Sequence, residues 1–136
     1  RSFPDFAWNA VDNYYPGDDY VDIVGLTGYN TGDYYEGETW RSFNDIYEPI
    51  YEAMAPQYQQ PFMITEFACS DIGGDKSAWI KDMFKQLPNY PRIKAAVWWN
   101  HADYDTDGTV ARSYFINSTD EVTTAVKNGL ADSNKR

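Results

Sequence analysis

Cysteine and histidine are nearly absent from this sequence of 136 residues, which has one of each, Cys69 and His101. A single cysteine cannot form a disulfide within the chain. A thiol nucleophile would need a histidine beside it, and nothing in the sequence places His101 near Cys69. We therefore expect Cys69 to be a small buried hydrophobic residue rather than a catalytic one.

Positive charge is also scarce. The chain has 11 Lys and Arg against 21 Asp and Glu, a net charge of −10 and a pI near 4.3. Nucleic acids and anionic membranes bind clustered Lys and Arg, so we expect neither as a partner. The simplest interpretation of this excess of acidic residues is a well-solvated protein surface. No apolar run has the length of a membrane span, and no charged-then-apolar leader is present.

Aromatic residues are abundant. The chain has 12 Tyr, 7 Phe and 5 Trp, together 18% of the residues. Many lie in loop-like stretches such as residues 14–17 and 34–35. Rings with an apolar face and a polar edge suit ligands of the same kind, and pyranose sugars are such ligands. The alternative for any single tyrosine is that it covers an edge of the core.

The hydrophobic pattern alternates between strands and helices. It predicts strands at residues 6–9, 21–26, 62–67 and 93–99, with a short hairpin between the last strand and Ile116. It predicts helices over residues 40–54, 75–87 and 118–130. We expect a kink or break at Pro49, an N-cap at Asp75, and a capping box from Ser118 to Glu121.

This alternation predicts one α/β domain over residues 1–136, with right-handed crossovers and a parallel sheet. In such sheets the chemistry gathers at the carboxyl ends of the strands. Glu66 is the most informative residue there, because a carboxylate at the rim of a buried strand is costly unless it is paired or used. Three other predicted strands end in Asn9, in Tyr29 and in the pair Trp98 and Trp99.

At these residues the chain resembles glycoside hydrolase family 26, a family of β-mannanases and related β-glucanases. The matching stretches follow the family's order and are YYPGDDYVDIVGLTGYN, WRSFNDIY, PFMITEF and PRIKAAVWWN. The resemblance implies a (β/α)8 TIM barrel, of which this chain supplies strands five to eight with their helices. A complete barrel takes about 250 residues, so the expected fold is a half-barrel.

The resemblance also implies roles for individual residues. Glu66 matches the nucleophile on strand seven, and Tyr29 matches the strand-six tyrosine that touches it. The implied substrate-binding residues are Trp8 and Asn9 at the end of strand five, Tyr15 in a neighbouring loop, and Trp98 at the floor of the sugar site with Trp99 as its rival. The implied activity is endo-acting, retaining hydrolysis of β-linked plant polysaccharide, such as mannan, mixed-linkage β-glucan or cellulose, by a secreted enzyme.

A retaining glycosidase needs a second carboxyl group as acid and base, about 5–5.5 Å from the nucleophile. In the family this group is usually part of a His-Glu pair on strand four, whereas here His101 is followed by Ala102. The loop carboxylates that remain as alternatives are Asp33, Glu36, Asp103 and Asp105. Phe115 stands where the family commonly has an arginine, and Arg112 is a nearby substitute. A carbohydrate-binding protein without turnover and a purely structural half-barrel are the competing functions.

Two further expectations concern assembly and metal. An isolated half-barrel exposes two sheet edges and an apolar interior, so we expect a homodimer or larger oligomer that completes the barrel. Asp103, Asp105 and Asp107 copy the first half of a calcium loop, D-x-D-x-D-G, but Tyr114 occupies the position where a bidentate Glu is needed. The choice there is between a structural calcium site and a solvated turn; no other cofactor is expected.

Overall fold

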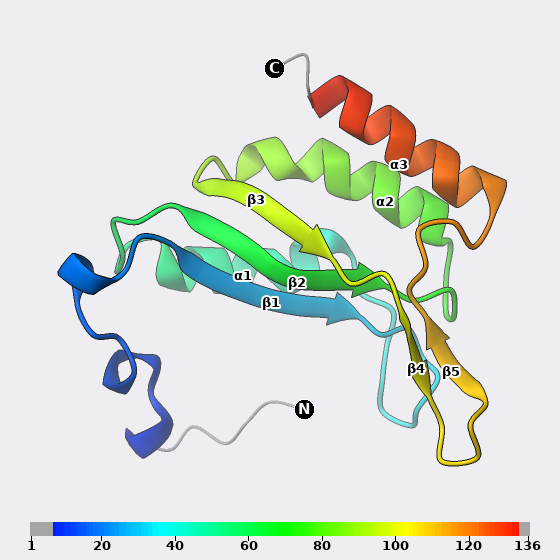
Figure 1. Ribbon diagram of the computed structural model, residues 1–136, viewed down its shortest axis with the longest axis horizontal. Helices are drawn as coiled ribbons and strands as arrows, with labels where there is room; N and C mark the ends of the chain where they lie inside the picture. The colour runs from blue at the N-terminus through cyan, green and yellow to red at the C-terminus, as the bar shows by residue number, and fades with distance from the viewer. Residues whose placement is uncertain (1–6, 134–136) are drawn as a thin grey trace.

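A three-stranded parallel sheet forms the centre of the computed structural model, which describes residues 7–133 (Figure 1). Its strands, in spatial order, are β1 (Val24–Asn30), β2 (Phe62–Cys69) and β3 (Ile93–Trp98). The helices are α1 (Phe43–Met54), α2 (Lys76–Gln86) and α3 (Asp120–Ser133). The fold is therefore α/β with parallel strands, as predicted, and is consistent with part of a β/α barrel.

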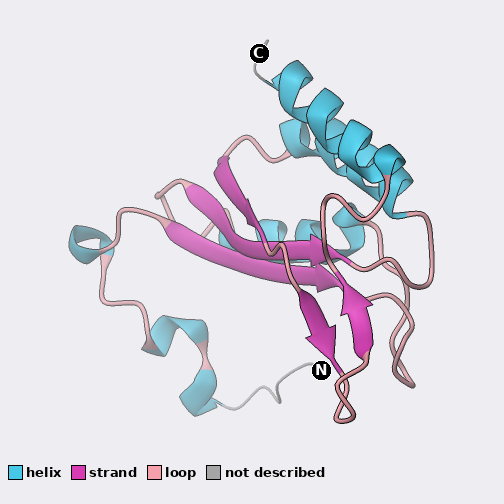
Figure 2. Cartoon of the chain, turned by 45° about the vertical axis from the view of Figure 1, so that its right-hand side comes forward, coloured by secondary structure: helices cyan, strands magenta, loops and turns pink. Residues whose placement is uncertain are grey.

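A short antiparallel hairpin follows the sheet. Its strands are β4 (Ala102–Tyr104) and β5 (Val110–Ser113). Figure 2 shows the hairpin beyond the carboxyl ends of the three parallel strands. Among residues 7–133, no helix has the length and hydrophobicity needed to cross a bilayer.

The strand expected at residues 6–9 is wrong for the part that is described. Ala7–Asn9 forms a 3-10 turn, and two more follow at Val11–Asn13 and Asp18–Tyr20. Asp and Asn side chains favour turns, and this segment is rich in them. Phe6 lies outside the described residues. The described sheet thus has three parallel strands rather than the four of a half-barrel.

The sequence patterns locate the helices well, with two local differences. The capping box at the start of α1 joins Ser42 and Asp45, and α1 continues through Pro49, where we expected a kink or break. The Asp75 carboxylate accepts the Ala78 N–H at the start of α2, as predicted. At the start of α3 the cap is Thr119, which accepts the Val122 N–H, rather than Ser118.

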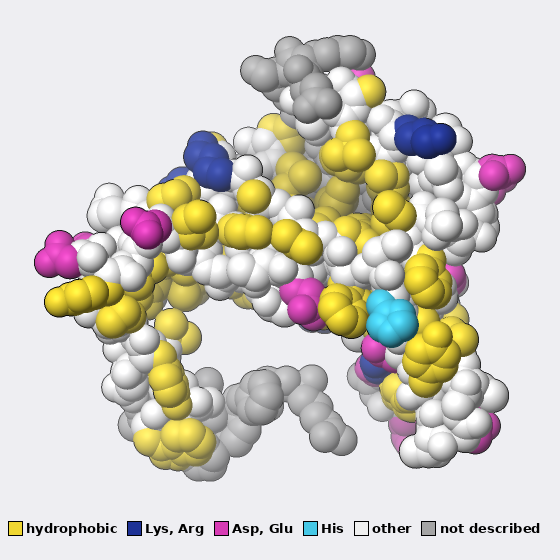
Figure 3. All heavy atoms as spheres, in the orientation of Figure 1, with side chains coloured by type: hydrophobic (Ala, Val, Ile, Leu, Met, Phe, Trp, Pro, Cys, Tyr) yellow, Lys and Arg dark blue, Asp and Glu magenta, His cyan; other side chains and the backbone are white. Residues whose placement is uncertain are grey.

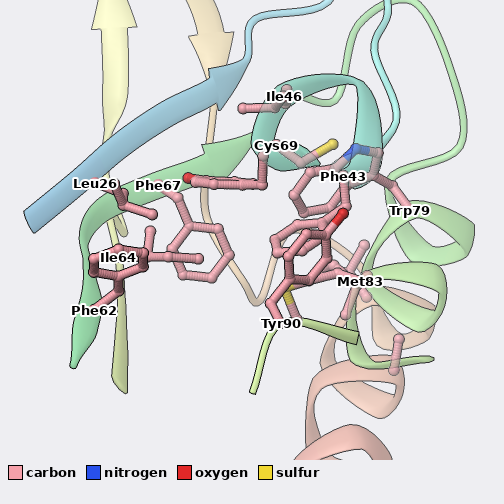
Figure 4. Packing of buried hydrophobic residues seen from close by; sticks show 14 of the residues in the cluster. Leu26, Phe43, Ile46, Phe62, Ile64, Phe67, Cys69, Trp79, Met83 and Tyr90 are labelled. Carbon is pink, nitrogen blue, oxygen red and sulfur yellow. The ribbon is translucent and has the colours of Figure 1, made fainter. Parts of the chain in front are cut away.

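Helices α1 and α2 cover one face of the sheet, and α3 packs on α2. Figure 4 shows the core between them, to which the helices contribute Phe43, Trp79 and Met83 and the strands contribute Leu26, Phe62 and Phe67. The opposite face of the sheet has no helix of residues 7–133 packed on it (Figure 1). The sheet therefore has one face in the core and one open face.

Cys69 is fully buried at the end of β2, as expected. Burial raises the pKa of its thiol to about 12, although a hydrogen bond from the Asn30 amide opposes the shift. A thiol with so high a pKa is a poor nucleophile at neutral pH. Cys69 is a packing residue in this fold.

Tyr47 generates a prediction about stability at high pH. It is fully buried, its hydroxyl donates to the Gly28 carbonyl oxygen at 2.9 Å, and burial raises its pKa above the ordinary 10.0. Above about pH 10 the unfolded chain releases this proton and the folded chain keeps it, so the free energy of unfolding should fall as the pH rises. Urea unfolding near neutral pH and at about pH 11 measures the loss.

Two tyrosine variants separate this effect from general alkaline damage. Tyr47→Phe should flatten the decline, because the variant has no proton to retain. Tyr20→Phe, which removes a phenol that is 80% exposed, should leave the decline unchanged. Identical pH profiles for Tyr47→Phe and the parent chain would contradict the prediction.

Candidate active site

An extra residue in β2 decides which side chains reach the open face of the sheet. Ile64 and Phe67 are both buried under the helices. Strict alternation along a strand would place two residues three positions apart on opposite faces of the sheet. Their partners are only two positions apart on each neighbouring strand: Leu26 and Gly28 on β1, Ala96 and Trp98 on β3. Thr65 and Glu66 lie between them, and both face away from the core. The irregularity is a β-bulge that turns Glu66 to the open face.

Hydrogen bonds hold the bulge in place. The Thr65 hydroxyl lies 3.2 Å from the Leu26 carbonyl oxygen and 3.0 Å from the Thr27 hydroxyl. Gly25 leaves room for it, since a Cβ there would come within 2.9 Å of the Thr65 methyl group. The local sequence thus suits a bulge at this position.

Tyr29 and Glu66 meet on the open face near the carboxyl ends of β1 and β2. The Tyr29 hydroxyl donates a hydrogen bond to Glu66 Oε1, and both side chains are partly buried. Burial raises the pKa of Tyr29 well above its ordinary value, and the hydrogen bond and charge of Glu66 raise it further. Tyr29 therefore stays protonated over the physiological range and remains a donor to the carboxylate.

An open pocket of about 300 Å³ surrounds this pair. Its lining residues come from the ends of all three sheet strands and from the hairpin: Tyr29, Thr31, Glu66, Trp99, Asp103, Arg112 and Tyr114. Two carboxylates, two phenols, an indole and a guanidinium thus face one space. Such a mixture of flat apolar faces and polar groups suits a sugar.

The hairpin supplies a polar wall to the pocket. Arg112 Nη1 donates to Asp103 Oδ2 at 3.0 Å, and the Tyr114 hydroxyl donates to the same oxygen at 3.1 Å. Arg112 also pairs with Glu38 and lies over the Tyr35 ring, 4.6 Å from its centroid. The Nε of Arg112 is buried and has no hydrogen-bond partner within residues 7–133.

A buried lysine attaches this wall to the helix α2. Lys76 Nζ donates to the carbonyl oxygens of Ser113 at 3.2 Å and Phe115 at 2.8 Å, and pairs with Asp71 at 2.9 Å. Ser113 and Phe115 flank Tyr114, whose ring packs 5.6 Å from that of Tyr29. Lys76 therefore connects the first turn of α2 to the segment that places Tyr114 beside the pocket.

Comparison with known proteins agrees with this geometry. Residues 3–69 match the family model described as Glycosyl hydrolase family 26. Over 119 residues the chain is 35% identical to Endoglucanase H of Acetivibrio thermocellus, an alignment that covers 86% of this chain and 12% of that protein. The chain thus resembles glycosyl hydrolase family 26 over about half of its length. The chain spans only a small part of this relative's length, and the matched range of the family model contains both Tyr29 and Glu66.

The structure separates the two tryptophans that the family 26 resemblance made rivals. Trp99 lines the pocket with Glu66. Trp98 points to the helix side of β3, where its ring packs against Phe67 at 5.1 Å and its Nε1 donates to the Tyr114 carbonyl oxygen at 2.7 Å. Neighbouring residues of a strand face opposite sides, so only one of them reaches the pocket. Trp99 and not Trp98 is thus the tryptophan beside Glu66, and its contact with a sugar stays a prediction.

The predicted contacts from the first part of the chain are not brought to the pocket. Tyr15 packs on Tyr58 with 4.8 Å between ring centroids and donates to Asp18, which also accepts from Gln60. Gln60 precedes β2, so Tyr15 lies at the opposite end of the strands from Glu66. Trp8 and Asn9 are exposed in or next to the first 3-10 turn, and neither lines the pocket.

One of the four acid/base alternatives reaches the pocket. Asp103 lines it, but Oδ2 of this carboxylate already accepts from Arg112 and Tyr114. Asp33, Glu36 and Asp105 are not among the lining residues, and Asp105 accepts from the Tyr34 hydroxyl at 3.2 Å. The pocket as described therefore has no carboxyl group, apart from Glu66, that is free of an ion pair.

The three aspartates of the calcium prediction point to different protein partners. Asp103 binds Arg112, whereas Asp107 accepts from the Thr109 N–H at 2.9 Å and from its hydroxyl. Residues 105–108 form the hairpin turn, which Gly108 closes with a φ of 83°. Within residues 7–133, no group of three or more His, Cys, Asp or Glu side chains is placed to hold a metal ion. The choice between a structural calcium site and a solvated turn stays a prediction.

The hairpin segment contributes more lining residues to the pocket than the sequence pattern predicts. Arg112 entered only as a weak substitute for an arginine, and Tyr114 and Thr31 were not predicted to line a site. The alternation of Arg112 and Tyr114 shows that they share one face of a strand. Both residues are far from β1 in the sequence, so the pattern alone does not predict that this face of the hairpin closes the pocket.

The Lys76 contacts predict a large effect of a single substitution. Lys76→Met should lower the free energy of unfolding by about 1–3 kcal/mol, because it leaves the Ser113 and Phe115 carbonyl oxygens without their donor. Urea unfolding measures the change. Lys81→Met, on the exposed side of the same helix, is the matched control and should have little effect. Equal stability of the two variants would show that Lys76 does not anchor the hairpin.

Proposed function

We propose that this chain carries the nucleophile part of the active site of a retaining, endo-acting glycosidase. The supporting observation is the carboxylate of Glu66, hydrogen-bonded to Tyr29 in an open pocket beside Trp99. The proposed substrate is a β-linked plant polysaccharide such as mixed-linkage β-glucan, cellulose or mannan. Because such polymers lie outside cells, we propose that the protein acts there.

Each group has a chemical task in this proposal. Glu66 attacks the anomeric carbon and forms a glycosyl-enzyme bond, which water later breaks. Tyr29 donates a hydrogen bond to the Glu66 carboxylate, which keeps the attacking group oriented. Trp99 gives the sugar ring a flat apolar surface and excludes water from one side of it.

The second carboxyl group of the reaction has to come from elsewhere. The general acid must carry a proton to give to the leaving oxygen. Asp103 Oδ2 is already engaged by Arg112 and Tyr114 on the hairpin. We propose that the acid is supplied by a protein segment that faces Glu66 across the pocket.

Association is the proposed source of such a segment. Within the described part of the chain, residues 7–133, the outer edge of β3 has no strand paired to it, and Val97 on this strand is 46% exposed. An apolar groove between β3 and the helices α2 and α3 lies next to this edge, lined by Phe67, Ile93, Trp98, Val126 and Leu130 among others. Unpaired edges and apolar grooves favour pairing with another chain. We propose that a second copy occupies this edge.

A carbohydrate-binding protein without turnover is the second candidate. The ion pair at Asp103 favours it, because it leaves Glu66 without a partner acid inside the pocket. This candidate shares the sugar contacts of the first and differs only in the absence of product.

The nucleophile assignment is tested by Glu66→Gln. We expect reducing-sugar release from lichenan, mannan and carboxymethylcellulose to disappear, because a neutral amide cannot form the glycosyl-enzyme bond. Glu48→Gln, on an exposed position of α1, is the matched control and should retain the parent activity. Activity of Glu66→Gln equal to the parent would refute the assignment; binding without release by the parent chain would favour the second candidate.

The association is tested by a charge at the free edge. Val97→Lys should shift the protein toward the monomer in size-exclusion chromatography with light scattering, because an edge lysine opposes strand pairing. Val110→Lys places the same charge on the hairpin at a similarly exposed position and should not change the mass. A parent chain that is monomeric at all concentrations would remove the proposal.

A further inference from the structure

A row of aromatic rings extends from the pocket onto the outer surface. Trp99 belongs to the pocket, and its ring lies 5.8 Å from that of His101, measured between centroids. His101 in turn lies 6.0 Å from Tyr104 and 6.3 Å from Phe115. Figure 3 shows the single histidine of the chain on the surface with hydrophobic side chains on both sides of it. The four residues form what we call the aromatic row.

The row is exposed although it is rich in hydrophobic surface. Trp99 is 40% and Tyr104 is 54% exposed, and His101 is exposed as well. These rings lie outside the core cluster that holds the sheet and the helices together. Large exposed aromatic side chains in one continuous group are typical of binding surfaces.

Backbone hydrogen bonds hold the row in a fixed position. The Trp99 N–H donates to the Phe67 carbonyl oxygen at 2.8 Å, and the Tyr114 N–H donates to the His101 carbonyl oxygen at 2.9 Å. Tyr104 is part of β4 and is paired with Val110 of β5. A ligand would therefore meet rings whose backbone is already ordered, which lowers the entropy cost of binding.

We propose that the aromatic row binds the sugar units of a β-linked glucan chain that lie beyond the unit held beside Glu66. Trp99 and Tyr104 offer apolar ring faces for stacking, and His101 between them offers ring nitrogens for sugar hydroxyl groups. Neighbouring rings are inclined by 67° and 62°, so the row is a series of separate contacts and not one flat platform. The spacing of these rings is similar to the length of one sugar unit. The inference rests on the proposed function, because it needs the glycan to enter the Glu66 pocket.

The row predicts that affinity depends on the length of the ligand. Calorimetry of the full chain in the Glu66→Gln form, which prevents cleavage, should give tighter binding of cellohexaose than of cellobiose. Tyr104→Ala in the same background should weaken binding of cellohexaose by about 3- to 10-fold and leave cellobiose unchanged, because only the longer sugar reaches Tyr104. Tyr104→Phe should keep the parent affinity, since the stacking face remains.

A control variant and the dependence on ligand length decide between the outcomes. Tyr20→Ala, which removes an exposed phenol far along the chain from the row, is the control and should change neither affinity. Equal affinity for the two sugars, no binding of either, or an unchanged cellohexaose affinity in Tyr104→Ala overturns the row. Length-dependent binding by a parent chain that releases no sugar sustains the row and refutes the hydrolase. Sugar release by the parent chain, with equal affinity for cellobiose and cellohexaose in the Glu66→Gln form, supports the hydrolase and refutes the aromatic row.

Discussion

The extra residue in β2 is the constraint on which the site depends. If the same sequence formed a regular strand with no bulge, alternation from Ile64 onward would bury the carboxylate of Glu66 under the helices and expose the ring of Phe67. Burying an unpaired carboxylate costs several kcal/mol, on the order of the whole stability of a small domain. The bulge removes this conflict, since it gives the core its aromatic ring and gives the open face its acid. One irregularity thus satisfies both packing and chemistry.

The site also depends on the position of the hairpin, which contacts from helix α2 help to fix. Lys76 belongs to the helix side of the molecule, yet its ammonium group reaches the carbonyl oxygens on both sides of Tyr114. The pocket wall is therefore attached to α2 as well as to the sheet. Together with the hydrogen bond from Trp98 Nε1 to the Tyr114 carbonyl oxygen, these contacts connect the site to the core.

Local patterns predicted much of the fold, and the family resemblance predicted the central pair. Three strands, three helices and the Asp75 cap follow from periodicity and capping rules, and Tyr29 and Glu66 lie together as the resemblance implied. The failures were of another kind. Trp98 and Trp99 are adjacent, and which of them reaches the pocket depends on how β3 pairs with β2, a contact between segments far apart in the sequence. The turns near Trp8 and Tyr15 depend on contacts with distant residues such as Tyr58.

The burial of Cys69 has a practical consequence. It is the only thiol of the chain, it is inaccessible in the native state, and it lies at the end of the strand that carries Glu66. A thiol reagent can modify it only when that end of the sheet opens. The rate of thiol modification therefore measures how often this end of the strand opens locally, and the measurement needs no engineered label.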